Sequence, residues 1–256
     1  MTLTHAAVLV LASALAGAVN AVAGGGSLIS FPAAVALGLP PLTANATNSV
    51  AMTPGSIASA FAYRRELARD RAALRVLLPS AFAGGLAGSI LLLITPARVF
   101  DTIVPLLVLF ATLLLFYQNV KRKGGDPEGA AWVLPKSTAG AVALQFLVGV
   151  YGGYFGAGMG IMMLAILDML GGVDIHGMNG VKSVLGTAIN AIASVAFILA
   201  GAVDYRAGAL MATGAVIGGL LGAAGARRVE PRLVRWAVVG IGLLITAALG
   251  YRRFVV

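Results

Sequence analysis

The sequence predicts an all-α polytopic membrane protein made of two inverted repeats, each a glycine-broken re-entrant helical hairpin followed by three transmembrane helices. Three observations predict this fold class. First, 59% of the 256 residues are hydrophobic and only 11% are charged, too few charges to cover the surface of a water-soluble domain of this length. Second, long uncharged windows recur along the whole chain, as in proteins with several membrane-spanning helices. Third, the two halves of the sequence match each other.

The match between the halves is an ordered set of similar residues at a nearly constant offset. The pairs at an offset of 134 residues include Asn45 with Asn179, Ser49 with Ser183, Thr53 with Thr187, and Gly84 to Gly88 with Gly218 to Gly222. Upstream of residue 40 an offset of 132 residues fits better and pairs Gly24 with Gly156. A series of matches in the same order indicates a duplicated unit. The glycine motifs are expected to pack helices, with contacts between the subunits of a homodimer as one use.

The same four parts are expected in each half. The first repeat, residues 1–118, holds a hairpin at 4–37 and helices at 44–63, 72–94 and 98–118. The second repeat, residues 137–256, holds a hairpin at 137–170 and helices at 177–200, 206–226 and 232–250. Residues 119–136 form the only extended polar segment, a linker expected in the cytoplasm.

Each repeat begins with a stretch that fits neither one nor two full crossings of a membrane. A continuous helix over the 34 residues at 4–37 would be roughly 50 Å long, against a hydrocarbon core of roughly 30 Å. We therefore expect each stretch to enter partway, unwind at glycine and return. The unwinding points would be Gly24 to Ser27 in the first repeat and Gly152 to Gly160 in the second. Non-helical backbone at this depth is tolerated only where protein buries it or where it lines a cavity.

Basic residues in the loops indicate that the two halves are inserted in opposite directions. Segment 64–75 carries five arginines against two acidic residues, which is typical of a cytoplasmic loop. In the second half the basic loop, at 227–235, comes one helix later than segment 64–75 does in the first half. A re-entrant hairpin plus three helices gives an odd number of full crossings per half, which would produce this shift.

The net charge of +9 does not indicate a nucleic-acid partner, because the basic residues lie at the ends of apolar segments rather than in one patch. The partner expected instead is the lipid bilayer. The chain has no cysteine, which excludes disulfides and cysteine-ligated metals. The sequence has no Walker, Gly-x-Ser-x-Gly or His-Glu-x-x-His motif, so we expect no enzyme activity, no metal site and no cofactor.

Polar residues cluster where two long apolar helices begin, a place where membrane helices normally avoid amides and charges. In secondary transporters with inverted repeats the substrate site lies at the repeat interface near the midplane, next to helix N-termini that suit an anion. We therefore expect these side chains to bind a small anion. The candidates are Asn45, Thr47, Asn48 and Ser49 in the first half and Asn179, Lys182 and Ser183 in the second. Capping and interhelical hydrogen bonding are the alternative roles for the amides and hydroxyls.

Lys182 is the one basic residue set well inside an otherwise uncharged segment, and it corresponds to Asn48 of the first half. A functional role is favoured, because no acidic residue nearby in the sequence neutralises its charge. The alternative is that its long side chain snorkels to the cytoplasmic interface.

Further candidates lie near the expected breaks and helix ends. Those for substrate binding are Asn20, Ser27, Ser30, Gln145, Tyr151 and Tyr154, with hydrogen bonding to the freed backbone of the breaks as the alternative. Asp168 is a candidate proton-relay carboxylate or only a helix end, and the helix end is favoured. His176 is expected in an interfacial loop, although the pKa range of histidine would also suit a proton-coupled step.

The glycine tracts and polar helix starts resemble a known family. The sequence resembles the signature of the sulfite exporter TauE/SafE family in Gly17-Ala-Val-Asn-Ala-Val-Ala-Gly-Gly-Gly-Ser27, Phe31-Pro32 and Thr43-Ala-Asn-Ala-Thr-Asn48. Its second-half counterpart is resembled by Tyr151-Gly-Gly-Tyr-Phe-Gly-Ala-Gly-Met-Gly160 and Asn179-Gly-Val-Lys182. This resemblance covers essentially the whole chain. It implies a permease of the bacterial inner membrane that moves sulfite, sulfonates or other small sulfur-containing anions, often as an exporter driven by a proton gradient.

The sequence therefore favours a secondary transporter, an exporter of a small sulfur-containing anion, that works by alternating access between two inverted repeats and is coupled to protons. A passive anion channel, or a permease for another small organic anion, would use the same positive site and is the alternative. A homodimer is a further expectation.

Overall fold

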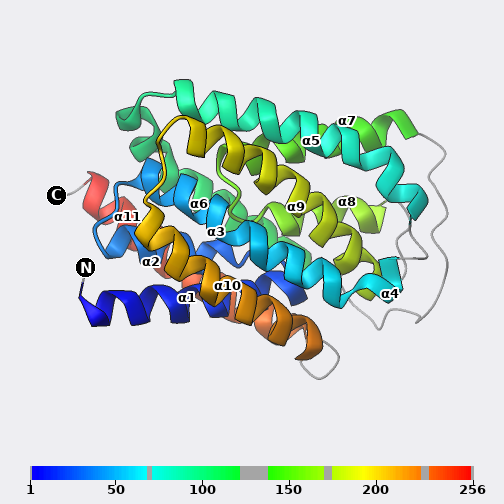
Figure 1. Ribbon diagram of the computed structural model, residues 1–256, viewed down its shortest axis with the longest axis horizontal. Coiled ribbons are helices and arrows are strands. Elements are labelled where there is room, and N and C mark those ends of the chain that lie inside the picture. Colours follow the sequence, from blue (N-terminus) through cyan, green and yellow to red (C-terminus); the bar gives the residue numbers. More distant parts are fainter. Residues whose placement is uncertain (1, 68–70, 122–137, 170–174, 226–230, 255–256) are drawn as a thin grey trace.

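The computed structural model describes residues 2–67, 71–121, 138–169, 175–225 and 231–254, and most of them are helical (Figure 1). The helices are α1 (Leu3–Val22), α2 (Ser27–Ala36), α3 (Pro41–Ala62), α4 (Arg64–Leu67), α5 (Arg71–Ile94), α6 (Ala97–Lys121), α7 (Thr138–Tyr154), α8 (Met159–Met169), α9 (Ile175–Leu199), α10 (Tyr205–Gly225) and α11 (Pro231–Phe254). No strand occurs within these ranges. Five helices of the described chain are long and apolar enough to cross a membrane, in α1, α5, α6, α9 and α10. The prediction of an all-α polytopic membrane protein is confirmed.

The outer surface of the bundle is apolar, as a bilayer requires. Large hydrophobic side chains that are about half exposed or more include Leu106, Phe110, Leu113, Leu147, Leu221 and Leu244. A water-soluble monomer rarely exposes so much contiguous apolar surface. These side chains therefore face lipid.

Both hairpins leave helical geometry at glycine. The breaks separate α1 from α2 and α7 from α8. Glycine adopts the left-handed backbone region at no steric cost. The residues with positive φ at the breaks are Gly24 (77°), Gly25 (84°), Gly156 (74°) and Gly158 (80°).

The two arms of each hairpin differ in length. α1 has 20 residues and α2 has 10, while α7 has 17 and α8 has 11. At a rise of about 1.5 Å per residue, α1 is roughly 30 Å long. Our expectation was that both arms stop partway, whereas α1 is long enough to cross a membrane by itself.

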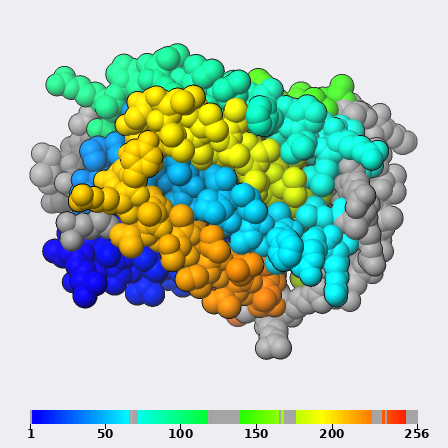
Figure 2. Space-filling view, in the orientation of Figure 1, coloured from blue at the N-terminus to red at the C-terminus, as the bar shows by residue number. Residues whose placement is uncertain are grey.

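α3 runs through the middle of the bundle and carries its polar side chains inward. It has 22 residues, enough to cross a membrane, yet its polar content keeps it out of the five apolar spans. It packs against α9 and α10, and Figure 2 shows only a strip of α3 at the surface between them. Ile57 and Phe61 are exposed on α3. Its buried polar residues are Asn45, Thr47, Asn48, Ser49, Ser56 and Ser59.

Glycines bring two pairs of parallel helices into backbone contact, α1 with α10 and α5 with α7. A Cβ added at Gly218 of α10 would overlap the carbonyl oxygen of Ala14 on α1. Small residues permit this close approach of membrane helices. The contacts of this kind are Gly214 on Val10, Gly218 on Ala14 and Gly222 on Ala18 in the first pair, and Gly84 on Phe146 and Gly88 on Val150 in the second.

The Gly-Gly-Leu-x-Gly motifs at 84–88 and 218–222 thus join the two halves of one chain. Each lies on a helix of one half and packs on the first hairpin arm of the other half. All six motif glycines are buried within the chain, so they do not lie at a surface that a second subunit could reach.

Contacts between the halves recur at the offset of the sequence repeat. Gly219 of α10 lies against the Gly55 carbonyl oxygen of α3, and the counterpart Gly85 of α5 lies against the Ile189 carbonyl oxygen of α9. In Figure 1, α1 and α3 run from left to right, whereas α7 and α9 run from right to left. The chain therefore holds two similar units: α1, α3 and α10 form one, and α5, α7 and α9 form the other.

Replacing Gly218 by alanine is expected to destabilise the protein, because the added Cβ would force α1 and α10 apart. Overpacking of this kind costs about 1–3 kcal/mol, which a fall in the Tm of the detergent-solubilised protein would report. Gly240→Ala is the matched control. Gly240 lies inside α11 with open space around it, so alanine there should leave the Tm unchanged or raise it. Equal effects of the two substitutions would contradict the packing role of Gly218.

Candidate functional site

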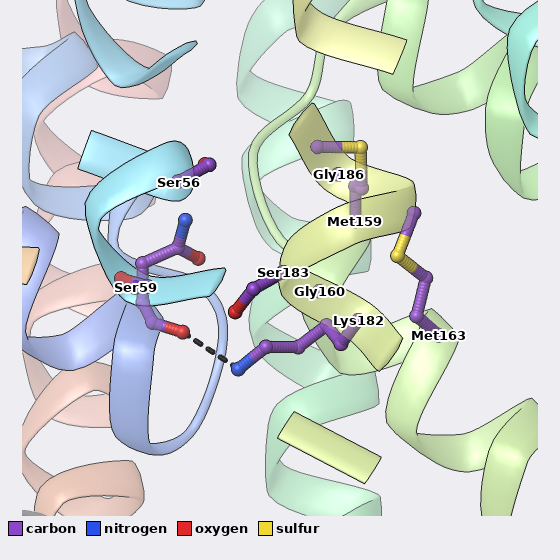
Figure 3. Close-up of a pocket in the computed structure, with 9 residues that line it drawn as sticks. Ser56, Ser59, Met159, Gly160, Met163, Lys182, Ser183 and Gly186 are labelled. Atoms are coloured by element: carbon purple, nitrogen blue, oxygen red, sulfur yellow. Dashed lines mark hydrogen bonds between the residues drawn. The ribbon is translucent and has the colours of Figure 1, made fainter. Parts of the chain in front are cut away.

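A small polar pocket lies where the first hairpin break approaches the start of α8 and the middle of α9. Its volume is about 20 Å³, room for about one water molecule. Figure 3 shows the Lys182 side chain extending from α9 across the pocket towards Ser56 and Ser59 of α3. The lining residues are Asn20, Ser56, Ser59, Met159, Gly160, Met163, Lys182, Ser183 and Gly186.

Lys182 ends on backbone oxygens inside the bundle. Its Nζ donates hydrogen bonds to the Asn20 carbonyl oxygen at 2.6 Å and to Asn179 Oδ1 at 2.7 Å, and it lies 3.5 Å from the Ala21 carbonyl oxygen. The residue is 4% exposed, so its side chain does not reach water at an interface as the snorkelling alternative requires. The last carbonyls of a helix have no partner within the helix and carry partial negative charge. Lys182 therefore caps the C-terminus of α1.

The side-chain amides of two asparagines at equivalent positions bind the hairpin break of the opposite half. Asn179 Nδ2 donates to the Val22 carbonyl oxygen at 3.2 Å, and Asn45 Nδ2 donates to the Tyr154 carbonyl oxygen at 2.9 Å. Val22 and Tyr154 are the last residues of α1 and α7, and they are 132 residues apart, as the repeat requires. In both halves the amide therefore satisfies a carbonyl that the break would leave without a partner, as the capping alternative proposed.

The serine hydroxyls of these helices donate to their own helices. Ser49 Oγ donates to the Asn45 carbonyl oxygen at 3.1 Å, and its counterpart Ser183 Oγ donates to the Asn179 carbonyl oxygen at 2.8 Å. Ser59 Oγ donates to the Gly55 carbonyl oxygen at 3.0 Å. A hydroxyl that donates to the preceding turn offers only its acceptor lone pairs to other groups. Ser59 and Ser183 thus present acceptors to the pocket.

The first-half candidates lie elsewhere in the interior. Asn48 Oδ1 accepts a hydrogen bond from Ser30 Oγ at 2.6 Å, and Thr47 Oγ1 accepts one from the backbone N–H of Asp204 at 2.9 Å. Both residues are buried, and neither lines the pocket. Of the eleven substrate-binding candidates, Asn20, Lys182 and Ser183 line it.

The candidates near the second break have different surroundings. Tyr151 Oη donates to the Ala157 carbonyl oxygen at 2.7 Å, a bond to the break itself. Ser27 is buried at the start of α2. Gln145 is fully buried in α7, and neither of its amide atoms has a hydrogen-bond partner among the described residues. None of the three lines the pocket.

The two proton-coupling candidates are at helix ends. Asp168 is the last residue but one of α8, and its side chain lies outside the described residues. His176 is the second residue of α9 rather than a loop residue. Its ring stacks on Tyr63 with the centroids 6.2 Å apart, and Tyr63 Oη donates to the Ala21 carbonyl oxygen at 3.3 Å. His176 thus lies beside the end of α1 that Lys182 caps.

Ser56 and Ser59 of the pocket were not predicted from the sequence, although a signal for them was present. They continue the spacing of three and four residues that starts at Asn45 and passes through Ser49 and Met52. This spacing places residues on one helix face. Extending the polar stripe along α3 would have found both serines.

Comparisons with known proteins agree over nearly the whole chain. The family model described as "Sulfite exporter TauE/SafE" matches residues 9–249. Similar curated proteins include the probable membrane transporter protein ORF9 of a Sinorhizobium species, 32% identical over 93% of this chain and 90% of the relative. A probable membrane transporter protein of Haemophilus influenzae is 29% identical over 96% of this chain and 94% of the relative. The probable membrane transporter protein YfcA of Escherichia coli K12 is 28% identical over 95% of this chain and 89% of the relative. No solved structure matches.

Alanine in place of Asn45 or Asn179 is expected to lower stability, because each change leaves a buried carbonyl without its donor. The expected loss is about 1–3 kcal/mol for each, measured by thermal unfolding in detergent. Thr213→Ala serves as control, since this exposed hydroxyl bonds only to its own helix. A Tm that stays at the wild-type value in both asparagine variants would show that the amides do not hold the breaks.

Gln145→Met is expected to raise the Tm. The substitution keeps the volume of the side chain and removes two buried polar atoms that have no partner, and an unsatisfied polar group costs about 1–3 kcal/mol. A fall in Tm would instead indicate that the amide binds a water molecule or another ligand.

Proposed function

This chain belongs to the sulfite exporter TauE/SafE family, and we propose that it is a secondary transporter that exports a small sulfur-containing anion, such as sulfite or an organosulfonate. Its relatives are named as probable membrane transporters, which indicates a membrane transporter rather than an enzyme. The proposed location is the bacterial inner membrane, the compartment that the family resemblance implies.

The observation that carries this proposal is the burial of Lys182 in the pocket. A charged side chain inside a membrane protein is costly and marks a functional site by default. Lys182 lies seven residues after the first residue of α9, within a span apolar enough to cross the membrane. Its ammonium is the charged group of the pocket lining, and an anion entering the pocket would meet it directly.

The mechanism that we propose is alternating access between two inverted repeats. The opposite directions of α1 and α7, and of α3 and α9, support inversion, as do the matching bonds of Asn45 and Asn179. The moving bodies would be the α1–α3–α10 unit and the α5–α7–α9 unit, since the closest backbone contacts lie within these units.

The pocket lies between these units, with Asn20, Ser56 and Ser59 on one side and Lys182 and Ser183 on the other. At about 20 Å³ it is too small for a sulfur oxyanion. Uptake of an anion would therefore need the two units to separate, and closure around the anion would restore the contacts. The family resemblance alone supports coupling to protons. Uphill export from proteoliposomes driven by a proton gradient would support it, and flux that only follows the anion gradient would favour a passive channel.

Replacing Lys182 by methionine is expected to abolish anion binding while the protein stays folded. Hydrogen bonds to charged groups contribute about 1.5–3 kcal/mol, so the affinity for sulfite and simple sulfonates should fall roughly tenfold to a hundredfold. Isothermal titration calorimetry on the purified protein measures this loss. Arg206→Met removes an exposed cation at the start of α10 and should leave affinity unchanged. Wild-type affinity in the Lys182 variant would overturn the assignment of the pocket.

A further inference from the structure

The charges around the pocket add up to about one positive unit. Lys182 is the charged residue among the nine that line it, and none of the nine carries a carboxylate. The C-terminus of α1 at Asn20 contributes the partial negative charge of a helix end, and the N-terminus of α8 at Met159 and Gly160 contributes a partial positive charge. Each helix end is equivalent to roughly half a charge. The two helix ends nearly cancel, so the ammonium remains.

The other polar groups of the pocket do not supply more positive potential. Ser59 and Ser183 donate their hydroxyl hydrogens to Gly55 and Asn179 and turn lone pairs to the pocket. A lone pair repels an anionic oxygen but accepts a hydrogen bond from a ligand. Lys182 therefore compensates one negative charge, and the hydroxyls do not compensate a second.

The remaining wall is apolar. Met159, Met163 and Gly186 line it opposite the serines of α3, and Figure 3 shows the two thioether side chains on that side. Methionine side chains are flexible and adapt to the shape of an apolar group. The wall suits an alkyl substituent and would not stabilise a second charged end.

We propose, on the basis of the proposed function, that this pocket selects small monoanions with one apolar end, such as short alkylsulfonates, over dianions. A monoanion beside Lys182 forms a neutral pair. A dianion leaves one negative charge without compensation in a site shielded from water, which is strongly unfavourable.

The test is a matched pair of ligands that differ in charge on the same carbon frame. Ethanesulfonate and 1,2-ethanedisulfonate are titrated into the purified full-length protein by calorimetry at constant ionic strength. We expect ethanesulfonate to bind at least tenfold more tightly. Equal or tighter binding of the disulfonate overturns the charge selection but leaves the proposed anion transport intact. If neither these ligands nor sulfite binds, the proposed function fails and the charge selection fails with it.

A second cation in the pocket provides an independent check. Ser56→Lys places an ammonium on α3, on the side facing Lys182, and should narrow or reverse the preference for ethanesulfonate. A variant that melts like the wild type and keeps the full tenfold preference would overturn the charge argument. If this variant fails to fold, the wild-type ligand pair decides the matter alone.

Discussion

The structure depends on satisfying the backbone carbonyls that the two hairpin breaks expose inside an apolar bundle. A break in a membrane helix leaves polar groups that lipid cannot solvate, so they need partners within the protein. Asn179 and Lys182 supply those partners for the end of α1, and Asn45 supplies one for the end of α7. The polar content of α3 and α9 follows from this requirement. Lys182 meets it with a charge where the other half uses an amide, which gives the pocket its cation.

These bonds also cross between the two packed units. Lys182 and Asn179 belong to α9 and bind α1, whereas Asn45 belongs to α3 and binds α7. Within each unit, backbones meet at glycine and have no side chains that could repack. Between the units, a few polar bonds and the methionine wall hold the pocket closed. The firm contacts and the replaceable ones are thus separated in space, as a transporter that opens around its substrate needs.

Composition and periodicity were sufficient to predict the helical membrane fold, and the glycine tracts pointed to the breaks, because these features are local. The polar cluster containing Lys182 was also visible, since a lysine in an apolar helix stands out in any sequence. The partner of Lys182 was not predictable, because it is the backbone carbonyl of Asn20, and a carbonyl leaves no mark in the sequence. For the same reason Asn48 was expected to face Lys182, whereas it accepts a hydrogen bond from Ser30. Ser56 and Ser59 were missed because the polar stripe of α3 was read only over its first turns.

The pairing of α1 with α10 has a consequence for biogenesis. α1 is the first helix of the chain and α10 is the last but one, so nearly the whole chain is synthesised before the glycine face of α1 meets its partner. Contacts of such long sequence separation form late and slowly. During synthesis α1 would reside in the bilayer as a single inserted helix, stable through its own hydrophobicity, and the bundle would close only when the second half arrives. The sequence of α1, apolar on all sides and without a charged residue after His5, suits that waiting state.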